Sequence, residues 1–312
     1  MKTSRGRSRH VLTIGSLLVL GIVASACGSS TPSAQPGTTT GTSVAPAAAG
    51  AGSADPAVKA LVPPDLQSKG SLTIAVSAAH PPNAFYDSHN TLVGWEIELG
   101  QALAAKMGLK PDFQKAEFSA IIPGLQSKRY DIGLSSISDT KARQRVLNFI
   151  DYFTTGTALL IQNSKSNGIS SLQDLCGQTV AVETGTSQVG FANNQSAKCT
   201  SSSKQPINVK AFPDETEMQL QIRTGRASAG LNALPVAEYI AQHSQGALKV
   251  ADGQYATAPI GIAVSKDSGE LLKALQAALK SVIADGTYSA ILAKWKLDQG
   301  ALSTATINGA TE

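Results

Sequence analysis

The chain has 312 residues, among them 26 Lys or Arg and 22 Asp or Glu, for a formal net charge of +4. Four of the basic residues and none of the acidic ones lie within residues 1–26, so the rest of the chain is neutral. A neutral body gives no electrostatic reason to expect nucleic acid as a partner, and its length allows one large or two modest domains.

Residues 1–26 predict a signal peptide. A basic start is followed by an apolar run over residues 11–23, which is too short to span a bilayer comfortably and ends in small residues. The sequence Ala24-Ser25-Ala26-Cys27 resembles a bacterial lipobox, whose Cys is lipidated, although Ala24 stands where Leu is usual. The alternative is a plain secretory signal cleaved after Ala26, which would leave Cys27 as an ordinary thiol.

Residues 27–60 predict a lipidated Cys27 and a flexible tether. The stretch is rich in Ser, Thr, Ala, Gly and Pro and cannot bury enough apolar surface to offset its ordering entropy. No later apolar run is long enough to cross a membrane. We therefore expect an extracytoplasmic body that is anchored to the cell membrane by its N-terminal lipid.

Strand and helix signals alternate along the body. Residues 72–76 predict a strand, and residues 95–107 predict a helix that ends at Gly108. Asp214 and Glu217 have the spacing of a helix start, and residues 285–287 break the last pair of helices. Further strands are expected at 132–135, 158–161, 179–182, 207–212, 229–231 and 260–264. This alternation favours parallel sheets covered by helices, an α/β fold.

Two cysteines remain after Cys27 is assigned to the anchor. Cys176 and Cys199 are an even pair in an oxidising compartment, which predicts a disulfide. No second Cys or His lies at ligand spacing near either one, so we expect no metal there and no cofactor.

Four stretches, taken in order and at their spacing, resemble a known family. They are Gly94-Trp95-Glu96-Ile97-Glu98-Leu99; Phe118-Ser119-Ala120-Ile121-Ile122-Pro123-Gly124-Leu125 with Tyr130-Asp131-Ile132; Ser136-Ile137-Ser138-Asp139-Thr140-Lys141-Ala142-Arg143 with Asn148-Phe149; and Asp285-Gly286-Thr287-Tyr288 with Lys294-Trp295. The body is similar to the extracellular solute-binding proteins, family 3, of polar amino acid ABC transporters.

The resemblance implies a two-lobed periplasmic-binding-protein-like fold of type II, with two hinge strands and a ligand cleft between the lobes. It divides the body into three parts and a tail: 61–153 and 256–302 as lobe 1, 154–255 as lobe 2, and 303–312 as the tail. Cys176 and Cys199 both fall in lobe 2, so their disulfide would cross no hinge.

The resemblance also implies a carboxylate clamp. Arg143, five residues after Ser138, occupies the position that holds the ligand's α-carboxylate, and its planar fork of donors suits that role. By the same positions, Ser136 would offer backbone groups and Ser138 its hydroxyl and N–H. From composition alone Arg143 would be a solvated arginine in a charge-rich stretch.

Two rings are expected to sandwich the ligand. Phe118 fits the family's aromatic position, with a core phenylalanine as the alternative. His80 stands where a carbocyclic ring is usual and could also hydrogen-bond a polar ligand; a surface loop histidine is its alternative.

In lobe 2, residues 182–187 run from a strand into a helix start, where backbone N–H groups favour an anion. Ser187 and Thr186 are the expected contacts, and Glu183 would face the ligand's distal end. Asn232 is a further candidate.

Ala233 departs from the family, which commonly has an Asp there for the ligand's α-ammonium; Ser77 likewise replaces an acid found in some members. A buried ammonium without a counter-charge is costly, so either Glu183 supplies the charge or the ligand lacks a standard α-ammonium.

The resemblance implies a monomeric binding protein, not an enzyme, that delivers an amino acid or a related small carboxylate to an ABC permease by hinge closure. A non-amino-acid carboxylate is the first alternative. A dehydratase on the same fold, with Glu183 and His80 as acid and base, and an accessory lipoprotein without a transporter are the others.

Overall fold

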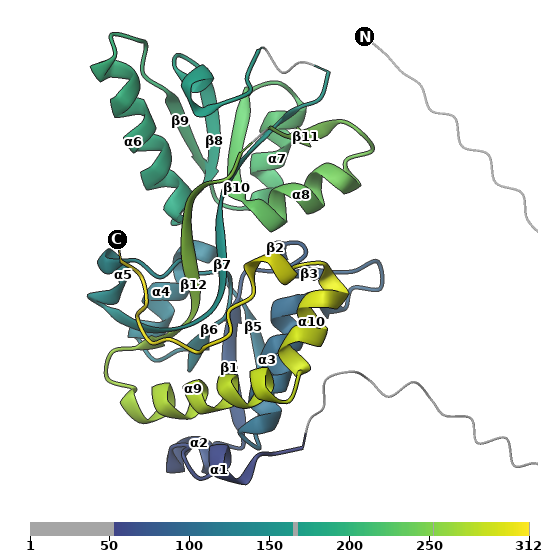
Figure 1. Ribbon diagram of the computed structural model, residues 1–312, viewed down its shortest axis with the longest axis vertical. Coiled ribbons are helices and arrows are strands. Elements are labelled where there is room, and N and C mark those ends of the chain that lie inside the picture. The colour runs from purple at the N-terminus through teal and green to yellow at the C-terminus, as the bar shows by residue number, and fades with distance from the viewer. Residues whose placement is uncertain (1–52, 165–167, 252, 312) are drawn as a thin grey trace, which may run out of the picture. The chain divides into compact units, whose positions relative to one another are not determined.

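The computed structural model describes residues 53–164, 168–251 and 253–311 (Figure 1). The predicted signal peptide, Cys27 and most of the tether lie outside these residues. No helix in the described part of the chain has the length and apolar character needed to cross a bilayer.

The described body contains one mixed sheet with helices packed on it. The strand order is β5-β1-β6-β12-β7-β10-β8-β9, and β11 also pairs with β7. The strands are β1 (Ser71–Val76), β5 (Lys110–Lys115), β6 (Ile132–Gly133), β7 (Leu147–Gln162), β8 (Thr179–Glu183), β9 (Asn208–Phe212), β10 (Ala229–Ala233), β11 (Leu248–Val250) and β12 (Tyr255–Ser265). A second small sheet has β2 (Ala79–His80), β3 (Ala84–Tyr86) and β4 (Leu92–Val93).

The α-helices fall between most of the strands, as the alternation predicts. They are α1 (Pro56–Lys59), α2 (Pro64–Lys69), α3 (Trp95–Lys106), α4 (Phe118–Gln126), α5 (Lys141–Gln144), α6 (Ser187–Ser201), α7 (Glu215–Arg223), α8 (Leu234–His243), α9 (Gly269–Ala284) and α10 (Thr287–Trp295). The short 3-10 helices are η1 (Leu172–Leu175) and η2 (Asp298–Gly300). Asp214 caps α7 as expected, because its carboxylate accepts from the Glu217 N–H at 2.9 Å.

Two long strands join the lobes (Figure 1). β7 leaves lobe 1 and β12 returns to it, so the two pair in antiparallel fashion, whereas β1 with β5 and β8 with β9 are parallel. The expected parallel sheets are therefore found within each lobe, and the crossing strands interrupt them. This arrangement follows from the chain's path, since a strand that returns must run opposite to the strand that left.

Each lobe has its own apolar core. In lobe 1, α3 packs on β1, α9 packs on β7, and α10 packs on both helices. Trp95 is only 1% exposed and packs on Tyr152 and Phe153. In lobe 2, the buried side chains of β7, β8 and β10 pack against α6, α7 and α8. Burial of this apolar surface is the main favourable term that holds each lobe together.

The structured body begins before residue 61, where the tether was expected to end. Asp55 accepts hydrogen bonds from the N–H groups of Ala57 and Val58 at the start of α1, and the Ser281 hydroxyl donates to the same carboxylate at 2.8 Å. Val58 is 3% exposed. Asp and Pro are also common in flexible tethers, so the sequence did not distinguish this short helix from a tether. Here Asp55 caps the helix and Pro56 begins it, and the helix packs on the body.

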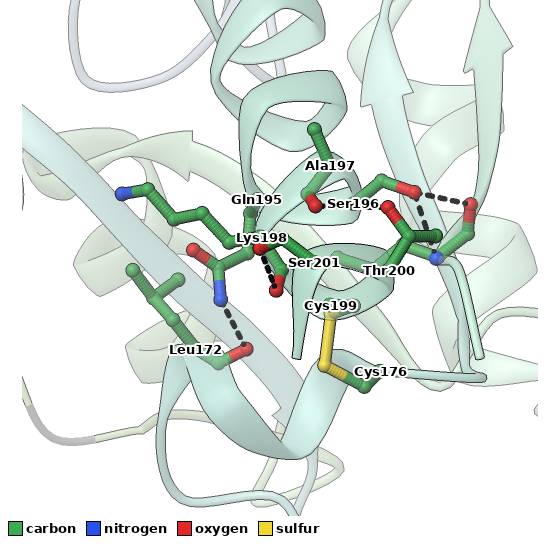
Figure 2. Close-up of a disulfide and its surroundings, with 10 residues drawn as sticks. Leu172, Cys176, Gln195, Ser196, Ala197, Lys198, Cys199, Thr200 and Ser201 are labelled. Atoms are coloured by element: carbon green, nitrogen blue, oxygen red, sulfur yellow. Dashed lines mark hydrogen bonds between the residues drawn. A yellow bond between two sulfur atoms is a disulfide. The ribbon is translucent and has the colours of Figure 1, made fainter. Parts of the chain in front are cut away.

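The predicted disulfide is confirmed (Figure 2). Cys176 follows η1, Cys199 lies on α6, and 23 residues separate them. The Gln195 side chain also donates to the Leu172 carbonyl at 3.2 Å, so α6 is tied to η1 twice. These ties fix the helix whose first residue, Ser187, faces the site described next.

Candidate functional site

A cavity of about 580 Å³ lies between the two lobes. This volume falls within the range of small-molecule sites. Eight of the nine residues expected to hold a ligand line it: His80, Phe118, Ser136, Ser138, Glu183, Thr186, Ser187 and Asn232. Residues that the sequence singled out thus gather on one cavity, and their contacts with a ligand stay a prediction.

Among the described residues, three polar contacts made by side chains cross from one lobe to the other. The hydroxyls of Ser138 and Ser187 lie 3.0 Å apart, and His80 Nε2 is hydrogen-bonded to Glu183 Oε2. The third is made by Arg143, whose Nη2 donates to the Gly185 carbonyl at 2.9 Å. Gly185 has φ +84°, and a Cβ there would come within 3.0 Å of Ser119, so glycine permits this close approach.

Arg143 is the expected residue that does not itself line the cavity. Its Nη1 donates to the Ser138 carbonyl at 2.8 Å, and its guanidinium lies 5.9 Å from the centre of the Phe118 ring, which does line it. Burial lowers the pKa of Arg143 to about 10, with the Asp139 charge opposing the shift, so the group stays charged at neutral pH. Its role as a carboxylate clamp stays a prediction.

Ser136 is held in place by Glu96, at the start of α3. The Glu96 carboxylate accepts from the Ser136 N–H at 2.7 Å and from its hydroxyl at 2.8 Å, and Asn83 donates to that hydroxyl at 2.7 Å. Ser136 has φ +47°, an uncommon conformation for a residue with a side chain, and these bonds sustain it. The Ser136 N–H is therefore already hydrogen-bonded to Glu96, so its carbonyl is the backbone group that could contact a ligand.

The cavity's other polar feature is a group of two acids and one amide that come from three elements. Glu183 ends β8, Glu215 begins α7, and both are almost fully buried, with 3% and 2% exposure. Asn232, near the end of β10, donates to Glu215 Oε2 at 2.6 Å. Since β8 and β10 are parallel neighbours, their carboxyl ends meet at one sheet edge, where α/β folds place ligand groups.

Several oxygens in this group have no hydrogen-bond partner within the described chain. They are Oε1 of Glu183, Oε1 of Glu215, Oδ1 of Asn232 and Oε2 of Glu96, all in residues that line the cavity. A buried acceptor without a donor costs free energy, and a buried charge costs more. The lining is therefore complementary to a ligand that brings positive charge and N–H donors.

The ionisation of His80 and Glu215 reflects this surplus of acid. Burial alone would lower the pKa of His80, but the hydrogen bond and charge of Glu183, together with the charge of Glu215, raise it to about 9. Burial and the Glu183 charge raise the pKa of Glu215 to about 8. The site therefore holds protons at neutral pH that a cationic ligand could replace.

His80, Glu183 and Glu215 are also the described residues best placed to hold a metal ion, because their ligand atoms lie within 4.8 Å of one another. The sequence spacing did not foretell this group, since the three residues lie far apart along the chain. The carboxylate oxygens of Glu183 and Glu215 also suit an organic cation, and an experiment can distinguish a metal ion from an organic cation.

Glu215 is the residue that sequence reasoning missed. It stands between Asp214, the helix cap, and Glu217, and in such a run an acid is usually a solvated first-turn residue. Gln188, Phe191 and Thr157 also line the cavity without having been expected. No local signal marks them, because only the packing of lobe 2 brings them to the cleft.

Comparison with known proteins identifies the family. Residues 72–298 match the model of the bacterial extracellular solute-binding proteins, family 3. The chain belongs to this family. Its relatives include the arginine-binding protein ArgT of Corynebacterium glutamicum, 32% identical over 254 residues that cover 81% of this chain and 83% of ArgT. The ABC transporter arginine-binding protein 1 of Escherichia coli is 28% identical, over 72% of this chain and 90% of its own length.

Solved structures of the same family share the fold. An ancestral arginine-binding protein bound to arginine is 32% identical and matches with a TM-score of 0.67, over 72% of this chain and 98% of its own. The ancestral amino acid-binding protein AncCDT-1, described as a precursor of cyclohexadienyl dehydratase, is 29% identical with the same TM-score, over 74% and 97%. The two-lobed, type II fold expected from the sequence is confirmed.

The coupled ionisation of the cleft predicts how stability varies with pH. The folded pKa of His80, about 9, lies above its ordinary value of 6.5, so its proton contributes stability that is full below about pH 6.5 and lost as the pH rises through 9. Glu215 acts in the same direction, because its raised pKa means that folding favours its protonated form. We expect the ligand-free unfolding midpoint to fall between pH 6.5 and 9.

The Glu183→Gln variant should reduce this fall, since it removes the main group that raises the pKa of His80. Thermal unfolding followed by circular dichroism across this pH range measures the effect. Exposed Glu270, replaced by Gln, is the matched control and should keep the full fall. A Glu183→Gln profile parallel to that of the unaltered protein would contradict the assignment.

Proposed function

We propose that this protein is the extracellular substrate-binding component of an ABC importer and that it captures a basic amino acid of the arginine type between its lobes. The single observation that carries the choice of ligand is the set of buried acids in the cleft whose free oxygens lack donors. The binding of arginine by its relatives ArgT and the E. coli protein, as their names state, supports the same choice.

The carboxylate end of the ligand is assigned to the side of the cavity where Ser138 and Ser187 face each other. The first N–H groups of α6 and the nearby Arg143 supply donors and positive charge there. To bind the ligand's carboxylate, Arg143 would give up its hydrogen bond to the Gly185 carbonyl and donate to the carboxylate instead. That exchange would keep the guanidinium satisfied in both states.

The cationic end is assigned to Glu215 and Glu183. Glu215 accepts a hydrogen bond from Asn232, the residue before Ala233 in the chain. It therefore places a carboxylate near the position where the family commonly has an Asp. This resolves the shortage of ammonium partners that Ala233 and Ser77 create, since two acids are available instead of one. A basic amino acid carries two cationic groups and could neutralise both.

A ligand screen tests the proposed function. We expect L-arginine to raise the unfolding midpoint more than neutral amino acids, and succinate or other acids without a cation to raise it little. A larger shift with Zn²⁺ than with any amino acid would reassign the acids to a metal. Turnover of a prephenate-like ring acid would revive the dehydratase alternative, for which His80 and Glu183 are the titratable pair.

Glu215→Gln sharpens the same test. Removing one member of a buried charge pair costs about 2–5 kcal/mol, so the dissociation constant of L-arginine should rise by roughly 30-fold or more. Calorimetric titration measures it. Glu217→Gln changes an exposed acid two residues along the same helix and should leave the affinity unchanged. Equal affinity in both variants would refute the role of Glu215.

Arg143→Ala should weaken binding by a similar amount, at least about 2 kcal/mol, because the ligand's carboxylate would lose its counter-charge. The exposed Arg145, replaced by Ala, is the control from the same charge-rich stretch. Calorimetry on the two variants decides between the clamp and the solvated-arginine interpretation, which predicts no change in either.

We also propose that Cys27 carries a lipid that anchors the protein outside the cell membrane, on the strength of the lipobox-like sequence and the composition that follows it. Incorporation of a labelled fatty acid, lost in Cys27→Ser together with membrane association, is the expected result. Membrane association that is unchanged in Cys27→Ser would rule the anchor out.

A further inference from the structure

The chain continues past the region that defines the family and stays attached to the hinge. The family match ends at residue 298, yet the last coil runs beside β7 and ends close to α5 (Figure 1). Ala301 bridges Phe153, Ile307 bridges Ile150, and the Asp151 N–H donates to the Thr306 carbonyl at 2.8 Å. Residues 303–312 were expected to be a simple tail, and the described part of them packs instead on β7.

Two buried acids hold the end of this segment. The Gly309 N–H donates to Asp151 Oδ2 at 3.0 Å, and the Ala310 N–H donates to Asp139 Oδ2 at 3.1 Å. Asp139 and Asp151 are 1% and 2% exposed. A carboxylate that accepts from backbone N–H groups makes a strong, charge-assisted contact, so these are specific attachment points for the segment.

The fit at Gly309 leaves no room for a side chain. A Cβ there would lie 2.4 Å from Asp151 Oδ2 and 3.0 Å from the Thr306 side chain. The backbone must therefore approach the carboxylate as closely as only glycine allows. Ala310, one residue on, is 5% exposed, whereas Gly309 and Thr311 on either side of it are exposed.

The end of the segment reaches the ligand cavity. Ala310 and Thr311 line it together with Ser138 and Asp139. Asp139 directly follows Ser138 in the chain, and its side chain also accepts from Gln144 at 2.9 Å, on the helix that carries Arg143. The attachment at Asp139 thus connects the C-terminal segment to the part of the wall assigned to the ligand's carboxylate.

We propose that residues 301–311 form a C-terminal strap that completes the wall of the ligand cavity and holds the Ser138–Arg143 segment in its binding position. The strap is a positioning element that the family match does not include. The inference rests on the proposed function only in taking the cavity as the ligand site.

The charges around the strap support this role. Burial and the neighbouring Asp139 raise the pKa of Asp151 to about 7, and Arg143 is the nearby cation that the Asp139 charge influences. The Gly309 N–H opposes this rise, because its hydrogen bond favours the ionised carboxylate, so the attachment of the strap and the charge of Asp151 stabilise each other.

Two variants test the strap by calorimetry with L-arginine, or with whichever ligand gives the largest shift in the screen, at a temperature where every variant is fully folded. Truncation after Asn308 removes both attachment points and should raise the dissociation constant by roughly tenfold, whereas truncation after Thr311 should not. Gly309→Ala keeps every strap residue but places a methyl group against Asp151, and should weaken binding in the same direction.

Gly269→Ala is the matched control, because a Cβ at Gly269 meets no atom within 4 Å. If the protein truncated after Asn308 and the Gly309→Ala variant both bind with full affinity, the strap is overturned and the proposed function stays intact. A folded Gly309→Ala variant that binds weakly, beside a Gly269→Ala variant that keeps full affinity, would support it. Failure of the full chain to bind any amino acid would count against the proposed function, and the strap is then judged with the ligand that does bind.

Discussion

Uncompensated acid in a closed cleft is the constraint on which the rest of this structure depends. Glu96, Glu183 and Glu215 are each at most 3% exposed, and each has a carboxylate oxygen without a partner in the described chain. Each such group lowers the free energy of unfolding, so its presence points to a function that compensates for the lost stability. On the proposed function the gain would be affinity for a cation, and the protons on His80 and Glu215 offset part of the negative charge at neutral pH.

The same charged groups bring the two lobes into contact. His80 comes from lobe 1 and Glu183 from lobe 2, so their hydrogen bond closes the cleft at the acidic side. Arg143 and Gly185 close it at the other side. A cationic ligand would compete with His80 for Glu183, and its carboxylate would compete with Gly185 for Arg143. On the proposed function, the groups that join the lobes would also contact the ligand, so binding would be coupled to hinge closure.

The sequence predicted the fold and much of the cleft because the decisive signals are local. Strand residues 72–76, the helix from Trp95 and the cap at Asp214 are set by periodicity and turn chemistry over a few residues, and the structure has all three. The disulfide followed from cysteine count and compartment. The residues placed at the site through the family resemblance also lie on the cavity wall, except that Arg143 stands just behind it.

What could not be predicted depends on contacts between distant parts of the chain. The sequence around Glu215 is typical of a solvated acid in the first turn of a helix. Its burial depends on the packing of α7 against β10 and on the hydrogen bond from Asn232. Residues 55–60 and 301–311 have the composition of linkers, and only their hydrogen bonds to α9 and β7 show that they are docked. No window of sequence contains both partners of these contacts, so no local rule could have found them.

The balance of charge in the cleft then argues for the length and polarity of the ligand. Arg143 and the two serines that face each other lie on one side of the cleft, and Glu183 and Glu215 lie on the other side with His80, where a cationic ligand could replace the protons of His80 and Glu215. A ligand with a carboxylate at one end and a cationic group at the other would match this pattern. A neutral amino acid would leave one acid dependent on His80 alone, and a dicarboxylate would place like charges together, at a cost that grows in a buried site. On the proposed function, the cleft would therefore select its ligand by charge before shape, and Glu215 would be the residue that favours the cationic group.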